Sequence, residues 1–230
     1  MKPRVIFFDI GHTLVTGAHQ SPRRLLGSRL ALTEKETHRL GKLIMTHPAE
    51  DPSTLATAVA AHFPQRDPHR IEQEITRLWE DQTLCVRCIP GAHRLFRRLK
   101  GAGIRLGVIS NIWHPFFNGF QKNFPEISSQ LDFTVLSYRL QHKKPSLDIY
   151  REAARKAGEP PQNCWMVGDS YELDMEPARR VGFKTLWILC RPERERSLLV
   201  ELLNAEKPLP DGVVEDLEAA DRFFMERLDS

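Results

Sequence analysis

The sequence predicts an α/β fold, a doubly wound parallel sheet into which a helical unit is inserted. Short runs rich in β-branched and aromatic residues alternate with helical patterns along most of the 230 residues. The runs are mostly continuous in apolar residues, as is typical of parallel strands that are covered on both faces. Because parallel strands need crossover connections, the helical patterns between them indicate helices on both faces of one sheet.

The predicted elements can be placed in chain order. Strands are expected at residues 5–8, 105–109, 133–136, 164–167 and 185–188. Ser146 is suited to cap a helix that runs to Gly158, and Gly158 is suited to end it. A second helix is expected over 172–181, with Gly182 in the same terminating role.

One long segment departs from this alternation. Between the first strand and Pro90, about eighty residues show only helical patterns. Asp67 followed by Pro68 is a helix start, and the residues after it place apolar side chains on one helical face. We therefore expect an all-α insertion that lies over the sheet as a lid.

These patterns divide the chain into two parts. Residues 1–14 and 88–230 are expected to form the α/β core, and residues 15–87 the helical cap domain. The segment from 207 to 212 is expected to be a loop, and a helix is expected over about 217–228.

Composition excludes several classes of protein. The 33 basic and 30 acidic residues give a net charge of +3 without a concentrated basic stripe, so we expect no nucleic-acid partner. No apolar run approaches the length of a membrane span, and the chain enters its first strand directly after Met1-Lys2-Pro3-Arg4. We therefore expect a cytoplasmic protein without membrane association.

The four cysteines indicate no disulfide framework. Cys85 and Cys88 form a single CxxC pair, which is most simply a chance spacing, with a redox pair as the weaker alternative. Cys164 and Cys190 are expected to be core thiols.

The residues at the ends of the predicted strands carry chemistry. Ligands of open α/β sheets bind at the carboxyl ends of the strands. Taken singly, these residues have structural interpretations, since Asp169 or Ser110 could be helix N-caps and Lys144 a surface lysine. Their joint occurrence at one sheet edge favours a site. The set is Asp9, Gly11, His12, Thr13, Ser110, Asn111, Lys143, Lys144, Asp169, Ser170 and Asp174.

This set resembles the haloacid dehalogenase (HAD) superfamily, whose members are mostly phosphatases. Four segments, in order, are similar to its four motifs. They are residues 5–14, a strand followed by DIGHT; residues 89–92 with 106–111; residues 142–145, HKKP; and residues 168–174, GDSYELD. The resemblance spans nearly the whole chain. It implies a Rossmann-like core with a mobile α-helical cap that closes over the site and sets substrate choice.

The resemblance also implies roles for the residues. Asp9 would be the nucleophile that forms an aspartyl phosphate, and would also touch a Mg²⁺ ion together with Asp169 and Asp174. Lys144 would neutralise the nucleophile and the phosphate, which Ser110 and Asn111 would also bind. Thr13 would orient the loop. The expected substrate is a small phosphorylated or otherwise anionic molecule, and the protein is expected to be a monomer or a homodimer.

Gly11 departs from the family pattern. Phosphatases of the family have a second aspartate here, which protonates the leaving group and then activates water. Loss of such help typically costs about 10²–10⁴-fold in rate. The backbone carbonyl of Gly11 can still serve the metal, so metal and phosphate binding should persist.

Three interpretations follow from this departure. The chain is a Mg²⁺-dependent phosphatase that is slow, or restricted to aryl and acyl phosphates, with His12 or a cap residue as a candidate proton donor. Alternatively, it is a 2-haloacid dehalogenase. Those enzymes also lack the second aspartate, because halide leaves without a proton, and they need no metal. Three converging carboxylates weigh against that, because without a metal they would repel an anionic haloacid. The third interpretation is a catalytically weakened scaffold that binds a phosphoryl ligand or a protein partner.

Overall fold

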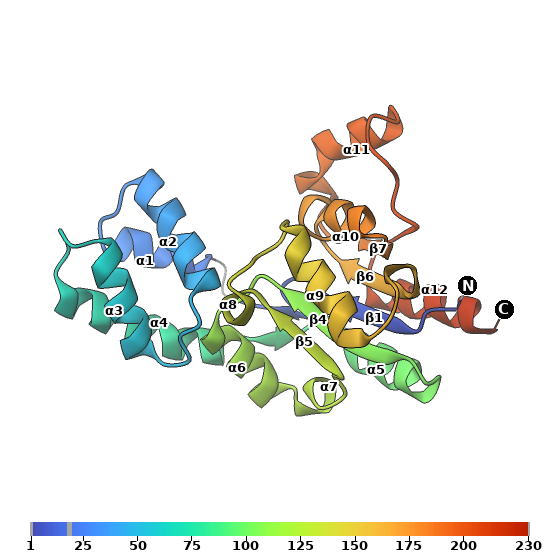
Figure 1. Cartoon of the computed structure of the whole chain (residues 1–230), viewed down its shortest axis with the longest axis horizontal. Helices are drawn as coiled ribbons and strands as arrows, with labels where there is room; N and C mark the ends of the chain where they lie inside the picture. Colours follow the sequence, from blue (N-terminus) through green and yellow to red (C-terminus); the bar gives the residue numbers. More distant parts are fainter. Residues whose placement is uncertain (1, 18–19, 230) are drawn as a thin grey trace.

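The computed structural model describes residues 2–17 and 20–229, and its centre is a six-stranded parallel sheet (Figure 1). Its strand order is β5-β4-β1-β6-β7-β8, so the chain moves outward on one side of β1 and then returns to fill the other side. This is the doubly wound arrangement that the sequence predicts. The strands are β1 (Val5–Phe8), β4 (Arg105–Ser110), β5 (Phe133–Leu136), β6 (Cys164–Gly168), β7 (Lys184–Ile188) and β8 (Gly212–Val214).

The last strand, β8, was not predicted. It begins at Gly212, the final residue of the segment interpreted as a loop, and pairs with β7 from Leu186 to Ile188. It has three residues and none of them is fully buried, so its sequence lacks the apolar run that marks the other strands.

Helices cover both faces of the sheet, and the side chains of β1 alternate between them. Ile6 and Phe8 pack in the cluster on one face, and Val5 and Phe7 in the cluster on the other. The first face carries α5 (Ala92–Gly101), α6 (His114–Asn123), α7 (Pro125–Ser128) and α12 (Leu217–Asp229). The second carries α9 (Leu147–Ala157), α10 (Glu176–Val181) and α11 (Arg196–Leu203). The four-residue helix α8 (Ser137–Leu140) follows β5 directly.

The predicted helix ends are confirmed at α9 and corrected at α10. Ser146 accepts a hydrogen bond from the backbone N–H of Asp148 at 3.3 Å, and Gly158 ends the helix with φ 62°. The helix predicted over 172–181 instead begins with a π-helical turn, Tyr171–Met175, and becomes α-helical only at Glu176. Pro177 has no backbone N–H to donate. It is therefore tolerated in the first turn of an α-helix but not in its interior, which agrees with a regular helix that begins at Glu176.

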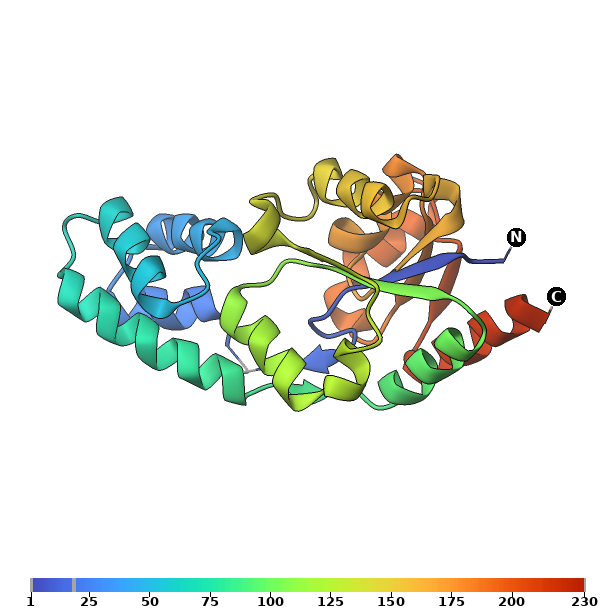
Figure 2. The ribbon, with the colours of Figure 1, turned by 60° about the horizontal axis from the view of Figure 1, so that its bottom comes forward.

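Four further helices pack against one another and are called here the helical subdomain (α1–α4). They share a buried cluster that includes Leu26, Leu40, Val59 and Ile75. As predicted, α4 begins after Asp67, which accepts a hydrogen bond from the N–H of His69 at 3.1 Å. The subdomain lies at one end of the molecule in both views (Figures 1 and 2). Its helices are α1 (Pro22–Arg29), α2 (Glu34–Thr46), α3 (Pro52–His62) and α4 (Pro68–Leu84).

The segment predicted to be purely helical also contains two short strands. β2 (Val15–Thr16) and β3 (Arg87–Cys88) pair in antiparallel fashion, with Val15 opposite Cys88. This ribbon lies where the chain leaves the sheet for the helical subdomain and where it returns. A two-residue strand is fixed by its partner across about seventy residues of chain, and so leaves no local pattern in the sequence.

In the described part of the chain, no helix is both long and apolar enough to cross a bilayer. Of the cysteines, Cys164 is buried as predicted, whereas Cys190 is exposed. The expectation for Cys190 is wrong because β7 ends at Ile188, so this thiol lies in the following loop and not in the sheet.

Candidate active site

The site begins where β1 ends, between its two neighbours in the sheet. Phe8 pairs with Val108 of β4 and with Val167 of β6, and the N–H of Asp9 donates to the carbonyl of Val167 at 2.9 Å. Asp9 therefore leaves the sheet where the strand order reverses. This is the position at which ligands of doubly wound folds bind.

Lys144 lies at the centre of the site and is 3% exposed. Its Nζ donates to Asp9 Oδ1 at 2.7 Å and to Asp174 Oδ1 at 2.6 Å. Burial favours the neutral amine, but the charges of Asp174 and Asp9 outweigh it and raise the pKa of Lys144 above its usual value. The lysine is therefore a permanent cation between two carboxylates.

Asn111 holds the backbone of Lys144. Its side-chain amide donates to the Lys144 carbonyl at 2.9 Å and accepts from the Lys144 N–H at 2.7 Å. This two-way contact joins the loop after β4 to the loop that carries the lysine. Asn111 thus positions Lys144, and its side chain also lines the site cavity.

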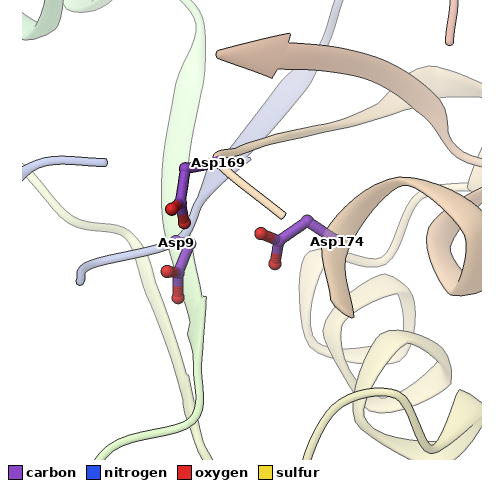
Figure 3. A group of neighbouring side chains, drawn as sticks. All are labelled: Asp9, Asp169 and Asp174. Carbon is purple, nitrogen blue, oxygen red and sulfur yellow. The ribbon is translucent and has the colours of Figure 1, made fainter. Parts of the chain in front are cut away.

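Three carboxylates converge beside this lysine. One oxygen from each of Asp9, Asp169 and Asp174 lies within 4.8 Å of the others, and Figure 3 shows the three groups facing one another. Clustered carboxylate oxygens are the ligands preferred by hard divalent cations such as Mg²⁺. The donor set therefore fits a divalent metal ion.

The position of Asp174 depends on a glycine in β6. A Cβ atom at Gly168 would lie 2.4 Å from the Asp174 carboxylate, so only glycine leaves room for this acid against the strand. The N–H of Ser170 donates to Asp174 Oδ2 at 3.1 Å. Burial raises the pKa of Asp174, and the ammonium of Lys144 opposes that rise.

Asp169 is paired with an arginine that the sequence analysis did not single out. The guanidinium of Arg191 donates to Asp169 Oδ2, and the backbone carbonyl of Asp169 accepts from Trp187 Nε1 at 3.1 Å. Burial and the charge of Asp9 raise the pKa of Asp169 to about 6, although Arg191 opposes the rise. The end of β7 was the available signal, because Arg191 follows that strand at the same sheet edge.

These groups line a cavity of about 320 Å³. Gly11 lies on its wall, and a Cβ atom built there would meet no other atom within 4 Å. His12 lies beside it with φ 59°. Its side chain is exposed in part, and the desolvation of the remainder, with the charge of Arg191, lowers its pKa. The described lining residues are Asp9, Gly11, His12, Asn111, Lys144, Asp169, Ser170, Leu173, Asp174, Arg191, Arg194 and Glu195.

Thr13 and Ser110 lie at the same sheet edge, but neither is among the described residues that line the cavity. Both are buried, at 1% and 2% exposure. The hydroxyl of Thr13 has no hydrogen-bond partner among the described residues. Their placement is compatible with support of the site, and the direct phosphate contact expected of Ser110 stays a prediction.

The comparisons with known proteins match this arrangement. The family model of the haloacid dehalogenase-like hydrolases matches residues 3–182. The chain belongs to this family and is a hydrolase. The matched range includes Asp9, Lys144, Asp169 and Asp174, so the four residues that meet in the structure all lie in the family region.

Individual relatives include both phosphatases and dehalogenases. A glyceraldehyde 3-phosphate phosphatase of Pyrococcus abyssi is 26% identical over 196 residues, 80% of either chain. An (S)-2-haloacid dehalogenase of Pseudomonas putida is 31% identical over 133 residues, 58% of this chain and 54% of that one. The fold is shared with a 2-haloacid dehalogenase of Pseudomonas syringae, with TM-score 0.63 and 17% identity over 98% and 99% of the two chains.

Proposed function

We propose that this hydrolase is a divalent-metal-dependent phosphatase that acts on a small phosphorylated metabolite through an aspartyl phosphate formed on Asp9. The observation that carries the proposal is the double contact of Lys144 with Asp9 and Asp174, beside a third carboxylate, in a cavity. This arrangement combines a nucleophile, a fixed cation and a set of hard oxygen ligands. The 26% identity to a glyceraldehyde 3-phosphate phosphatase supports it.

In the first step, a carboxylate oxygen of Asp9 attacks phosphorus and the bond from phosphorus to the leaving oxygen breaks. Lys144 donates to Oδ1, so we expect the second oxygen to attack. The ammonium offsets part of the repulsion between the anionic nucleophile and the phosphate. The proton for the leaving alkoxide has no donor at Gly11, so it comes from water or from a neighbouring group.

In the second step, water attacks the phosphoryl group and the bond between phosphorus and the Asp9 oxygen breaks. Inorganic phosphate leaves, the carboxylate is regenerated, and the proton of the water passes to solvent. Since Gly11 carries no base, this step is expected to be slow as well.

A bound Mg²⁺ would neutralise phosphate charge, and Asp9, Asp169, Asp174 and the carbonyl of Gly11 are the residues proposed to hold it. Ser110 and Asn111 are proposed to stand near the phosphate. The helical subdomain is proposed to act as the cap over the site, within the domain boundaries 15–87. Its closure would exclude water during the first step.

A second candidate is a 2-haloacid dehalogenase. Halide needs no proton when it leaves, so Gly11 would carry no penalty. The Arg191–Asp169 pair also weakens the electrostatic objection, because Lys144 and Arg191 together offset two of the three carboxylate charges. An anionic haloacid would therefore meet less repulsion than the sequence alone suggests.

A turnover assay separates the candidates. An aryl phosphate, an alkyl phosphate and 2-chloropropionate are each incubated with the protein in Mg²⁺ and in EDTA. We expect Mg²⁺-dependent release of phosphate from the aryl ester, poor turnover of the alkyl ester, and a loss of at least about 10³-fold in D9N. Chloride release that persists in EDTA would establish the dehalogenase instead, and no turnover on any substrate would leave only a binding scaffold.

A further inference from the structure

Arg191 stands in the acidic part of the site, in the loop after β7. Its guanidinium donates to Asp169 Oδ2, the side chain of Asp169 is 5% exposed, and that of Arg191 is 28% exposed. The arginine thus reaches from the rim of the cavity onto a buried carboxylate. No role for it follows from the four family motifs.

The backbone fixes Asp169 independently of this pair. The Asp169 carbonyl accepts from the buried indole of Trp187 at 3.1 Å, and its main chain continues directly from β6. Loss of the Arg191 side chain would therefore leave the backbone of Asp169 in place at the edge of the cluster. Its main effect would be to remove one positive charge from the immediate surroundings of the three acids.

That charge opposes any cation that enters the cluster. A guanidinium on Asp169 Oδ2 places a positive charge beside any cation that this carboxylate binds, and two positive charges a few ångströms apart repel each other strongly in a buried site. A second carboxylate, that of Glu195, lines the same cavity. Burial and the charge of Glu172 raise the pKa of Glu195, and the charge of Arg191 opposes that rise. Arg191 thus keeps an acidic neighbour in the cavity when it leaves Asp169.

We propose that Arg191 is the resident counter-cation of Asp169, and that it competes with the divalent metal for this carboxylate and so sets the metal affinity of the site. The inference rests on the proposed metal-dependent function, which it deepens. It assigns the metal concentration at which the enzyme becomes active to one side chain of the loop after β7. Asp9 and Asp174, which pair with Lys144, would be less affected.

Titration calorimetry of the protein stripped with EDTA tests the proposal, with Mg²⁺ and Mn²⁺ as the probes. We expect R191Q to bind both ions at least about tenfold more tightly than the natural chain, because a neighbouring positive charge is gone. R191K keeps the charge and should stay close to the natural affinity. R194Q removes a charge from the same loop at the cavity rim and should change the affinity less than R191Q.

Thermal unfolding of the same proteins gives a second measurement. Without metal, R191Q should melt below the natural chain because Asp169 is left buried and unpaired, and Mg²⁺ should raise its melting temperature by more. Unchanged or weaker metal binding by folded R191Q would overturn the proposal, since an arginine that merely orients Asp169 predicts weaker binding. Absence of metal binding by every variant would overturn it too.

These results are separable from the proposed function. A protein that hydrolyses the aryl phosphate with Mg²⁺ while R191Q leaves the metal affinity unchanged refutes the role of Arg191 alone. A protein whose R191Q variant binds metal more tightly but which hydrolyses no phosphate ester refutes the phosphatase and retains the competition.

Discussion

Gly11 and Asp169 are the two residues at which the chemistry of this site can be tested most directly. Gly11 occupies the wall of the cavity and offers a backbone but no side chain to a reaction in which a proton is first given to the leaving group and later taken from water. Asp169 carries a carboxyl whose pKa burial raises to about 6, although Arg191 donates to it. Each residue therefore has a measurable consequence of its own.

Replacing Gly11 by aspartate should raise the turnover of alkyl phosphates by about 10²-fold, because it restores a general acid and base. The change is sterically open, since a Cβ atom at Gly11 meets nothing within 4 Å. Steady-state kinetics on alkyl and aryl phosphates measure the effect. The control is G11N, whose side chain has the size of aspartate but cannot act as a general acid or base. Equal activity of folded, metal-bound G11D and the natural chain would show that proton transfer is not limiting.

The raised pKa of Asp169 predicts a pH-dependent response to metal. Its ordinary pKa is about 3.9, so between about pH 4 and 6 the folded state holds a proton that the unfolded state releases. The free energy of unfolding contributed by this group therefore falls as the pH rises through that window, by up to about 3 kcal/mol. Metal binding requires the ionised form, and so its stabilising effect grows over the same range.

Differential scanning fluorimetry with and without Mg²⁺ measures this effect. We expect a larger shift in melting temperature above about pH 7 than near pH 5. In D169N the pH dependence of the shift should shrink, because that carboxyl no longer titrates. An identical shift at both pH values in the natural chain would contradict the assignment.

At the scale of the elements, the helix ends show how local rules and packing combine. Gly182 ends α10 with φ 103°, in the left-handed region where a Cβ is strained. G182A should therefore lower the free energy of unfolding by about 1–2 kcal/mol, measured by urea denaturation. The control is G101A at the end of α5, where a Cβ meets no atom within 4 Å and φ is not in that region. It should be neutral, or stabilising by up to about 1 kcal/mol.

At the scale of the whole molecule, one tryptophan joins the helical subdomain to the sheet. Trp113 follows β4 and is 2% exposed, yet it belongs to the buried cluster of α1–α4. Its ring packs edge-on against that of Trp79 in α4, with the ring centroids 5.7 Å apart. The two parts are thus connected by packing as well as by the β2–β3 ribbon. The cap function proposed for the subdomain depends on this attachment.

W113A should lower the free energy of unfolding by about 3–5 kcal/mol and speed hydrogen exchange in α1–α4 more than in β1 and β4. W113F is the matched control, because it keeps one aromatic ring in place of the larger indole, and the indole N–H that it removes has no hydrogen-bond partner among the described residues. Its effect should be clearly smaller. Uniform acceleration of exchange across sheet and subdomain in W113A would mean that the tryptophan does not act as a local attachment.

Much of this architecture is determined by short-range patterns in the sequence. The runs at 5–8 and 164–167 become strands because they are apolar throughout, and the run at 133–136 because it is rich in β-branched and aromatic residues. Ser146 bounds α9 through its side-chain cap and Gly158 through its left-handed backbone. The acids and the lysine of the site were identified because they follow strands whose carboxyl ends must share one edge.

Other features were decided only by the tertiary structure. β8 and the β2–β3 ribbon depend on partners distant in the chain, and Asp174 reaches its place because Gly168 leaves room for it. In the sequence, nothing distinguishes Arg191 from other loop residues. Only the structure shows that the loop after β7 places it against Asp169. Side-chain identity and local spacing suffice to predict strands and caps, whereas the charge balance of a site depends on through-space distances, and only the folded chain sets those.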